Sequence, residues 1–122
     1  MDDVELFFQG ANKQLEEARF QLTHERYNMA VNRSYYAIFY AAKALLAKKG
    51  IFPKKHSGTL HQFSFEYVKK DNFDYETYLL YAKLMEDRSD ADYEVLVNFN
   101  EEEAMEAVES PEIFINECVR FI

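Results

Sequence analysis

Residues 33–47, RSYYAIFYAAKALLA, are the stretch of this 122-residue sequence that decides the fold. Between Tyr35 and Ala47 the only charged residue is Lys43, and no Gly or Pro interrupts the run. A helix that is apolar almost all round is buried in the middle of a protein. We therefore predict a central helix, enclosed by the other helices of a single all-α domain that spans residues 1–122.

The rest of the chain predicts an up-and-down bundle of four to five helices with no sheet. Only three Gly and two Pro occur, which favours long helices with short connections. The expected helices cover about residues 3–23, 27–49, 57–70, 75 to between 88 and 93, and 101–122. Gly10 lies inside the first of them and costs about 1 kcal/mol relative to Ala. We therefore expect a neighbouring helix to approach closely at Gly10.

Several helix ends carry residues that are typical of caps and stops. Ser57 or Thr59 is expected to cap the third helix, Asp74 the fourth and Asn100 the last. Gly50, preceded by two lysines, is expected to end the central helix. Pro111 has no backbone N–H, and we predict that it kinks or divides the last helix.

The sequence predicts a cytoplasmic protein with no membrane segment. Its longest uninterrupted apolar run, Tyr35 to Ala42, is far shorter than the roughly 18 residues that spanning a bilayer needs. The opening Met-Asp-Asp lacks the basic start of a secretory signal. Cys118 is the only cysteine, so no intrachain disulfide can form, and its apolar neighbours predict packing in the core.

Charge is distributed unevenly along the chain. The formal net charge is −8, which argues against broad nucleic-acid binding, and residues 86–122 contain 12 acids but only two Lys or Arg. By contrast, no acid occurs between Glu25 and Glu66, where two arginines, five lysines and two histidines lie. This basic segment either attracts a phosphate chain or is simply solvated, and the composition leaves both open.

Most familiar catalytic sites are absent from the sequence. One Cys and three scattered His do not form a zinc set, because His56 and His61 are five residues apart rather than four. The three glycines do not form a phosphate-binding loop, and no serine has a nucleophile-elbow context. We expect no metal and no cofactor.

Two groups of residues remain as candidates for function. The first lies on the central helix, where Arg33, Tyr36, Tyr40 and Lys43 recur at helical spacing. An arginine in so apolar a run needs a partner, since an unpaired buried charge costs several kcal/mol. Arg33 therefore either pairs with an acid such as Asp90 or Asp92 and fixes the helix register, or faces a groove and holds a phosphate.

The second group lies at the end of the fourth helix, in the stretch Asp87-Arg-Ser-Asp-Ala-Asp-Tyr93. Hydrophobic patterning gives no reason for so many polar groups at one helix end. They form either a solvated terminus or a polar site in which Arg88 binds a phosphate while Asp92 and Tyr93 orient groups around it.

Three segments in this order resemble the small stand-alone HEPN-domain proteins of bacteria and archaea. They are residues 33–50, residues 55–61 (KHSGTLH), and residues 88–93 followed by an acidic last helix. The resemblance implies a helical bundle that forms a homodimer and works as a toxin beside a minimal nucleotidyltransferase antitoxin. It also implies a metal-independent ribonuclease groove, formed across the dimer by an Arg followed by four to six residues and a His.

The sequence departs from that motif. Tyr40 stands where a histidine would follow Arg33, and Asp92 or Tyr93 stands where one would follow Arg88. Proton transfer near neutral pH is the task of histidine, and neither tyrosine nor aspartate replaces it without a large pKa shift. His56 could reach the groove from a neighbouring loop. In paired systems of this kind the antitoxin can transfer AMP to a tyrosine, and Tyr93 would be the corresponding residue here.

Two functions follow from these patterns. The first is RNA or nucleotide binding in a groove at a homodimer interface, through Arg33, Tyr36, Tyr40, Lys43 and His56. Ribonuclease activity at Arg88, Asp92 and Tyr93 would accompany it only if another group replaced the missing histidine. The second is a protein-interaction module without nucleic acid, in which the acidic last helix docks a partner through Phe114, Ile115 and Phe121.

Overall fold

The computed structural model describes the backbone of residues 2–93 and 98–122, and their side chains except those of 90–93. The helices are α1 (Asp3–Thr23), α2 (Tyr27–Lys48), α3 (His56–Phe63), the π-helical turn η1 (Ser64–Lys69), α4 (Tyr75–Tyr93) and α5 (Glu101–Val119). No strand occurs in these ranges. The prediction of an all-α bundle is confirmed.

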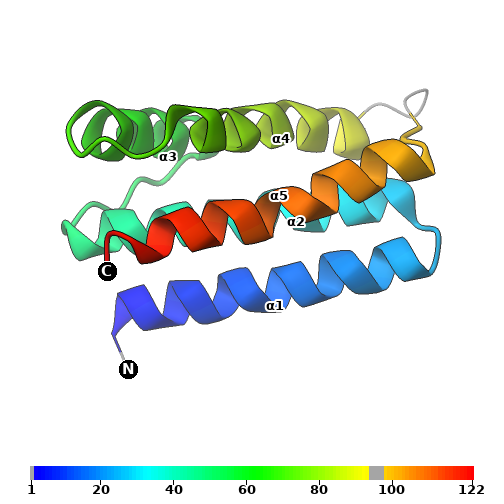
Figure 1. Cartoon of the computed structure of the whole chain (residues 1–122), viewed down its shortest axis with the longest axis horizontal. Coiled ribbons are helices and arrows are strands. Elements are labelled where there is room, and N and C mark those ends of the chain that lie inside the picture. Colours follow the sequence, from blue (N-terminus) through cyan, green and yellow to red (C-terminus); the bar gives the residue numbers. More distant parts are fainter. Residues whose placement is uncertain (1, 94–97) are drawn as a thin grey trace.

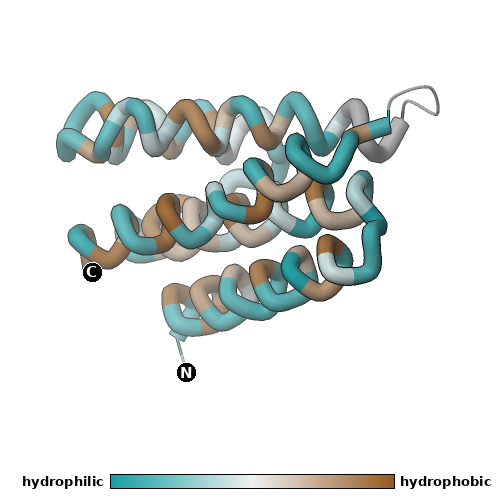
Figure 2. Tube along the Cα trace, turned by 45° about the vertical axis from the view of Figure 1, so that its right-hand side comes forward, coloured by the Kyte–Doolittle hydropathy of each residue, from teal (hydrophilic) through white to brown (hydrophobic). Residues whose placement is uncertain are grey.

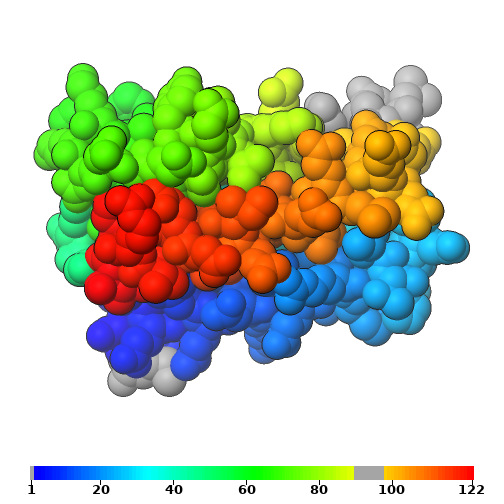
Figure 3. Space-filling view, in the orientation of Figure 1, coloured from blue at the N-terminus to red at the C-terminus, as the bar shows by residue number. Residues whose placement is uncertain are grey.

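The four long helices run along the same axis of the molecule in alternating directions (Figure 1). Figure 1 places α4, α5 and α1 as successive rows with α2 behind α5, and both termini at the same end. In the space-filling view, α5 fills the middle of this face between α4 and α1 (Figure 3). Hydrophobic and hydrophilic residues alternate along α1 and α5 in Figure 2, as expected of helices that bury one side.

Helix α2 is the centre of the bundle, as its sequence predicts. It packs against α1, α3, α4 and α5. Its largest buried side chains include Tyr35, Ile38, Leu45 and Leu46, none of which exposes any surface. The remaining helices contribute one buried side each, so the core forms around α2.

The ends of α4 and α5 are capped as predicted. An Asp74 carboxylate oxygen accepts hydrogen bonds from the backbone N–H and the hydroxyl of Thr77, at 2.9 and 2.7 Å. Asn100 and Glu103 form a capping box, with distances of 2.8 and 3.0 Å. Both caps satisfy backbone donors that have no partner inside the helix.

The predicted caps of α3 are wrong. The helix begins at His56, and its N-cap, Lys55, makes no side-chain hydrogen bond. Thr59 lies inside the helix and donates its hydroxyl to the Lys55 carbonyl at 2.9 Å. The predicted single helix over 57–70 is α3 followed by η1, where the Tyr67 hydroxyl donates to the Leu45 carbonyl of α2. His56 is therefore the first residue of a helix rather than part of the loop before it.

Pro111 does not divide α5, which runs continuously from Glu101 to Val119. A proline removes one hydrogen bond from a helix interior, and the flanking turns keep theirs. The Ser110 hydroxyl donates to the Glu106 carbonyl at 3.3 Å, one turn back, and both Ser110 and Pro111 are buried. Packing against the bundle therefore holds the helix together across the proline.

The last helix also supplies core residues. Cys118 is buried as predicted, and burial raises the pKa of its thiol. Phe114 has no exposed surface, and Ile115 and Phe121 are partly buried against the core. These three side chains therefore do not form the docking surface that the sequence offered as a second function. None of the helices in the described ranges combines the length and the hydrophobicity of a membrane-spanning segment.

Two glycines lie in contrasting settings. A Cβ added to Gly10 would lie 3.6 Å from Cγ of Tyr40, which is an ordinary van der Waals contact. The close approach of α1 to α2 at Gly10 is therefore confirmed, but it leaves room for a methyl group. Gly50 follows α2 with a φ of 75°, a left-handed conformation that side chains disfavour.

We predict that Gly10→Ala raises the free energy of unfolding by about 0.5–1 kcal/mol, because it removes the helix cost of glycine without a clash. Gly50→Ala should lower it by about 1 kcal/mol, because alanine is strained at positive φ. Urea denaturation of both variants measures the difference. A destabilised Gly10→Ala protein would mean that α1 and α2 are packed too tightly to accept a methyl group.

Candidate functional site

One side of α2 is left open by the surrounding helices. Between Ala30 and Leu46 every residue is buried except Arg33, Tyr36, Tyr40 and Lys43, which are partly exposed. Their spacing of three, four and three residues keeps them on one face over about 15 Å of helix. We call these four residues the α2 seam. They are the residues that the sequence predicts as binding residues on this helix.

Arg33 is held by neutral groups. Its Nε donates to the Asn32 side-chain oxygen at 2.7 Å, and one terminal nitrogen donates to the Gln14 side-chain oxygen at 3.1 Å. Its guanidinium carbon lies 5.0 Å from the centre of the Tyr36 ring. Among the described side chains, no carboxylate forms an ion pair with Arg33. The predicted partners Asp90 and Asp92 lie outside the described side chains.

A surface hollow of about 400 Å³ adjoins Arg33. It is lined by Lys13, Gln14, Glu17, Met29 and Arg33. Two of these residues, Lys13 and Arg33, are cations and one, Glu17, is an acid. The Glu17 carboxylate accepts a hydrogen bond from the Gln21 side chain at 2.9 Å. The hollow therefore gives an anion room to approach the guanidinium from solvent.

The other end of the seam is also cationic. The Lys43 ammonium lies 5.2 Å from the ring centres of Phe7 and Phe39, and it forms no ion pair with a described carboxylate. Tyr40 packs against Phe7 with their ring centres 6.4 Å apart. Aromatic faces attract a cation without neutralising it, so Lys43 keeps its charge available to a ligand.

Arg88 extends from α4 to the same face of α2. Its guanidinium carbon lies 5.0 Å from the ring centre of Tyr35 and 6.0 Å from that of Tyr36. Arg33 and Arg88 are 55 positions apart in the sequence, yet both contact the ring of Tyr36. The sequence predicted a site containing both arginines, and the fold places them together.

His56 completes this cluster from the first turn of α3. Its Nδ1 lies 2.6 Å from the Tyr35 hydroxyl. Its ring stacks on Phe39, with 4.4 Å between ring centres and an angle of 6° between ring planes. Tyr36 meets the same ring edge-on at 5.8 Å. His56 is therefore fixed in the site, where the sequence offered only the possibility that it reaches the groove.

The charged form of His56 is disfavoured. Partial burial lowers the pKa of the imidazole, and the positive charges of Arg88 and Lys43 lower it further. Burial raises the pKa of the Tyr35 hydroxyl, although the positive charge of Arg88 opposes this. At neutral pH the site therefore holds a neutral imidazole and a protonated phenol beside cations.

Tyr35 is the residue of this site that the sequence did not reveal. It lies in the apolar run and is fully buried, so its pattern is that of a core residue. The one signal in the sequence was the hydroxyl group of this tyrosine. A buried hydroxyl needs a hydrogen-bond partner, so its presence in an apolar run indicates a polar group nearby. Two other predicted site residues, Asp92 and Tyr93, have side chains outside the described residues, and their roles stay predictions.

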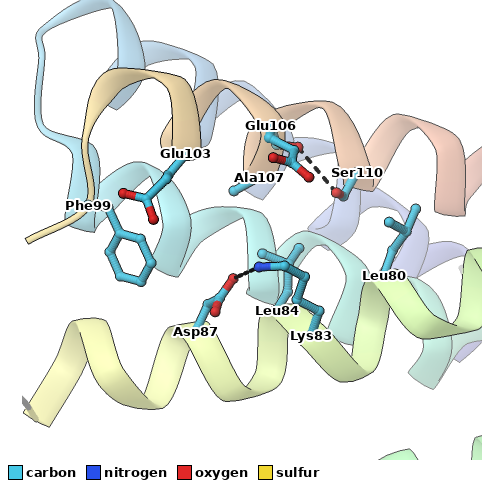
Figure 4. Close-up of a pocket in the computed structure, with 9 residues that line it drawn as sticks. All are labelled: Leu80, Lys83, Leu84, Asp87, Phe99, Glu103, Glu106, Ala107 and Ser110. Atoms are coloured by element: carbon cyan, nitrogen blue, oxygen red, sulfur yellow. Dashed lines mark hydrogen bonds and ion pairs between the residues drawn. The ribbon is translucent and has the colours of Figure 1, made fainter. Parts of the chain in front are cut away.

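A separate cavity of about 170 Å³ lies between α4 and α5 (Figure 4). Figure 4 shows Glu103 and Glu106 on α5 facing Lys83 and Asp87 on α4, with Lys83 and Asp87 paired at 2.9 Å. None of the seam residues lines this cavity. In the described part of the chain, no three His, Cys, Asp or Glu side chains gather closely enough to hold a metal ion.

Comparison with known proteins identifies the family. Residues 4–122 match the model of the HEPN domain. The chain belongs to the HEPN family. The resemblance noted in the sequence is thereby confirmed over nearly the whole chain.

The relatives are small proteins of similar length. "Putative toxin MJ0142" from Methanocaldococcus jannaschii is 35% identical over 120 residues, which cover 98% of this chain and 82% of the relative. A "UPF0332 protein" from Thermotoga maritima is 37% identical over 119 residues, which cover 98% and 90%. A crystal structure of TT1696 from Thermus thermophilus superposes over the full length of both chains with a TM-score of 0.83 at 17% identity, which supports the HEPN fold.

The pKa of His56 gives a direct test of this site. We predict a value below the ordinary 6.5, rising in Arg88→Gln and Lys43→Gln, because each substitution removes a nearby positive charge. Because the folded state disfavours the charged imidazole, stability should fall as the pH drops through about 6.5. NMR titration of the imidazole signals measures the pKa, with His56→Asn to assign them. A pKa at or above 6.5 would contradict the site geometry.

Proposed function

We propose that this HEPN protein is toxin-like and binds RNA or a nucleotide through the α2 seam, together with Arg88 and His56. The observation that carries the proposal is the convergence of Arg33 and Arg88 on the ring of Tyr36. Guanidinium groups bind phosphate oxygens with paired hydrogen bonds, and half-exposed tyrosines give bases a surface on which to stack. Two relatives carry the name of putative toxin, which supports the toxin-like role.

The electrostatics of the site favour an anion. Arg33 and Lys43 contact amide oxygens and aromatic rings, and neither forms an ion pair with a described carboxylate. Burial lowers the pKa of His56, and the positive charges of Arg88 and Lys43 lower it further. These cations stand out in a protein of net charge −8, because a cluster of positive charge creates a field that attracts anions locally whatever the overall charge. Phosphate is the ligand that such a field attracts.

We further propose that two copies of the chain form the complete groove, and that a minimal nucleotidyltransferase is the antitoxin partner. The seam is a half-exposed strip of cations and aromatic rings along a central helix, which suits a groove shared by two subunits. Sedimentation of the purified protein tests the dimer. An adjacent reading frame for a nucleotidyltransferase would support the pairing, and co-purification of the two products would test it.

Binding of a fluorescein-labelled single-stranded RNA, followed by anisotropy, tests the proposed ligand. Arg33→Gln and Lys43→Gln should each weaken binding and lower the slope of log affinity against log salt by about 0.7, because each removes one phosphate contact. Binding by the native protein should weaken steeply between low and moderate salt. Unlabelled ATP as a competitor distinguishes an RNA site from a nucleotide site.

Arg19→Gln is the matched control for this experiment. Arg19 is an exposed arginine of α1 that pairs with Glu112 at 3.0 Å and contacts no seam residue. Its substitution removes the same charge and should leave binding unchanged. If the seam variants bind RNA as well as the Arg19 variant does, the seam is not the binding site. Salt-independent docking of a protein partner in place of RNA would favour the interaction-module function.

A further inference from the structure

Part of the basic segment noted in the sequence lies outside the α2 seam. Residues 51–70 contain four lysines and one glutamate, a net charge of +3 in a chain of net charge −8. They form the loop after α2, helix α3 and the turn η1. The site described above takes only His56 from this stretch, so it gives no reason for the lysines or for the exposed aromatic rings beside them.

The outer side of α3 and η1 is exposed at every fourth residue. Positions 57, 61, 65 and 69 are all exposed, whereas Phe63 and Tyr67 between them are buried in the core. Residues four apart lie on one side of a helix, so these positions form a strip about 18 Å long. π-helical turns such as η1 are rare and often occur at functional sites. We call the following exposed residues the α3 strip: Lys54, Lys55, His61, Phe65, Lys69 and Lys70.

Phe65 is the aromatic centre of the α3 strip. Its side chain is 43% exposed, and the ammonium groups of Lys70 and Lys69 lie 4.7 and 5.8 Å from the centre of its ring. A single exposed phenylalanine is ordinary on a protein surface. An exposed ring flanked by two cations, however, offers a face on which a base can stack and positive charges for the phosphates on either side of that base.

Most lysines of the α3 strip keep their charge available. In the described part of the chain, no carboxylate forms an ion pair with Lys54, Lys55 or Lys69, whereas Lys70 pairs with Glu66 at 3.3 Å. The Glu66 side chain is only 14% exposed and also lies 3.6 Å from the Lys49 ammonium. The one acid of this stretch is therefore occupied by the protein's own cations, and the outer side of α3 attracts anions.

We propose that the α3 strip is a second RNA-binding surface, which holds the part of a single strand that extends beyond the α2 seam. Helix α3 joins the two surfaces, because its first residue, His56, stacks on Phe39 of α2 with 4.4 Å between ring centres. The lysines bind phosphates and Phe65 stacks on a base without sequence preference. This inference rests on the proposed binding of RNA and deepens it: the ligand is a strand of several nucleotides, not a mononucleotide.

The strand length of the RNA provides the first test, because only a long strand reaches both surfaces. Labelled single strands of about 4 and about 16 nucleotides cover the usual site sizes of single-strand-binding modules. The double variant Lys54→Gln/Lys69→Gln should weaken binding of the long strand and lower the slope of log affinity against log salt by about 1.4. Its affinity for the short strand should stay near the native value, whereas Arg33→Gln should weaken binding of both strands.

The matched control is the double variant Arg19→Gln/Lys83→Gln. Both cations lie outside the α2 seam and the α3 strip, and they pair with Glu112 and Asp87 at 3.0 and 2.9 Å. The control removes the same two positive charges and should leave both affinities near the native values. If it weakens binding of the long strand as much as the strip variant does, the effect comes from net charge and the α3 strip is not a site.

Phe65→Trp gives a readout of base stacking. The sequence has no tryptophan, so the substitution introduces a single indole, whose fluorescence the long strand should quench. Ile113→Trp is the control, because Ile113 is 50% exposed on α5 and its indole should not respond. Phe65→Leu keeps an apolar side chain and should weaken binding of the long strand about tenfold or more, with urea denaturation to show that the variant is folded. Equal quenching of both indoles would contradict stacking at Phe65.

The outcomes separate this inference from the proposed function. If the native protein binds neither RNA nor ATP, both fail. If it binds ATP but no RNA, or if Arg33→Gln weakens RNA binding while the strip variants bind the long strand as the native protein does, only the α3 strip fails. Vesicles that contain phosphatidylserine are the competing ligand. Vesicle binding that depends on Lys54 and Lys69, with RNA binding unchanged in the same variant, would make the strip a membrane surface and overturn the inference.

Discussion

The enclosure of α2 is the constraint on which the rest of the structure depends. Four other helices pack against it, so only one face is free to carry polar side chains. That face holds two cations with two tyrosines between them, whereas the buried remainder is almost entirely apolar. Burial of a polar group without a partner would destabilise the core. Between Ala30 and Leu46, the open seam is therefore the part of the central helix where charge is compatible with a stable fold.

The contacts of Arg33 and Lys43 decide whether their positive charges stay available to a ligand. Arg33 is oriented by two side-chain amide oxygens and a ring, and Lys43 by two rings. These contacts fix direction but leave the positive charge unbalanced, in contrast to Lys49 and Arg19, which pair with carboxylates. Several acids of α5 have local roles, since Glu103 caps the helix and Glu117 pairs with Arg120. Cations that pair with carboxylates, such as Lys49 and Arg19, are already neutralised, whereas Arg33 and Lys43 keep a positive charge that a ligand could meet.

The seam could be predicted from sequence because it depends only on helical periodicity. Residues 33, 36, 40 and 43 share a face in any α-helix, and the apolar run between them fixes which face is open. The remainder of the site depends on how α3 and α4 dock on α2, which periodicity does not specify. His56 was placed before the helix instead of at its start, because Ser57 and Thr59 looked like better caps. Tyr35 was hidden by its burial, since a phenol in an apolar run has the pattern of a core residue.

A histidine does not need to follow an arginine on the same helix for the two to act together. What proton transfer requires is a short distance, a fixed ring and a neutral nitrogen, and each is a property of three-dimensional packing. In this protein Tyr35 supplies the short contact, Phe39 fixes the ring plane, and Arg88 and Lys43 disfavour the charged imidazole. These four residues come from α2 and α4, so the start of α3 lies against both helices in the cluster that contains Arg88. The position of His56 in this cluster therefore depends on how α3 packs against α2, which the spacing of residues along one helix does not predict.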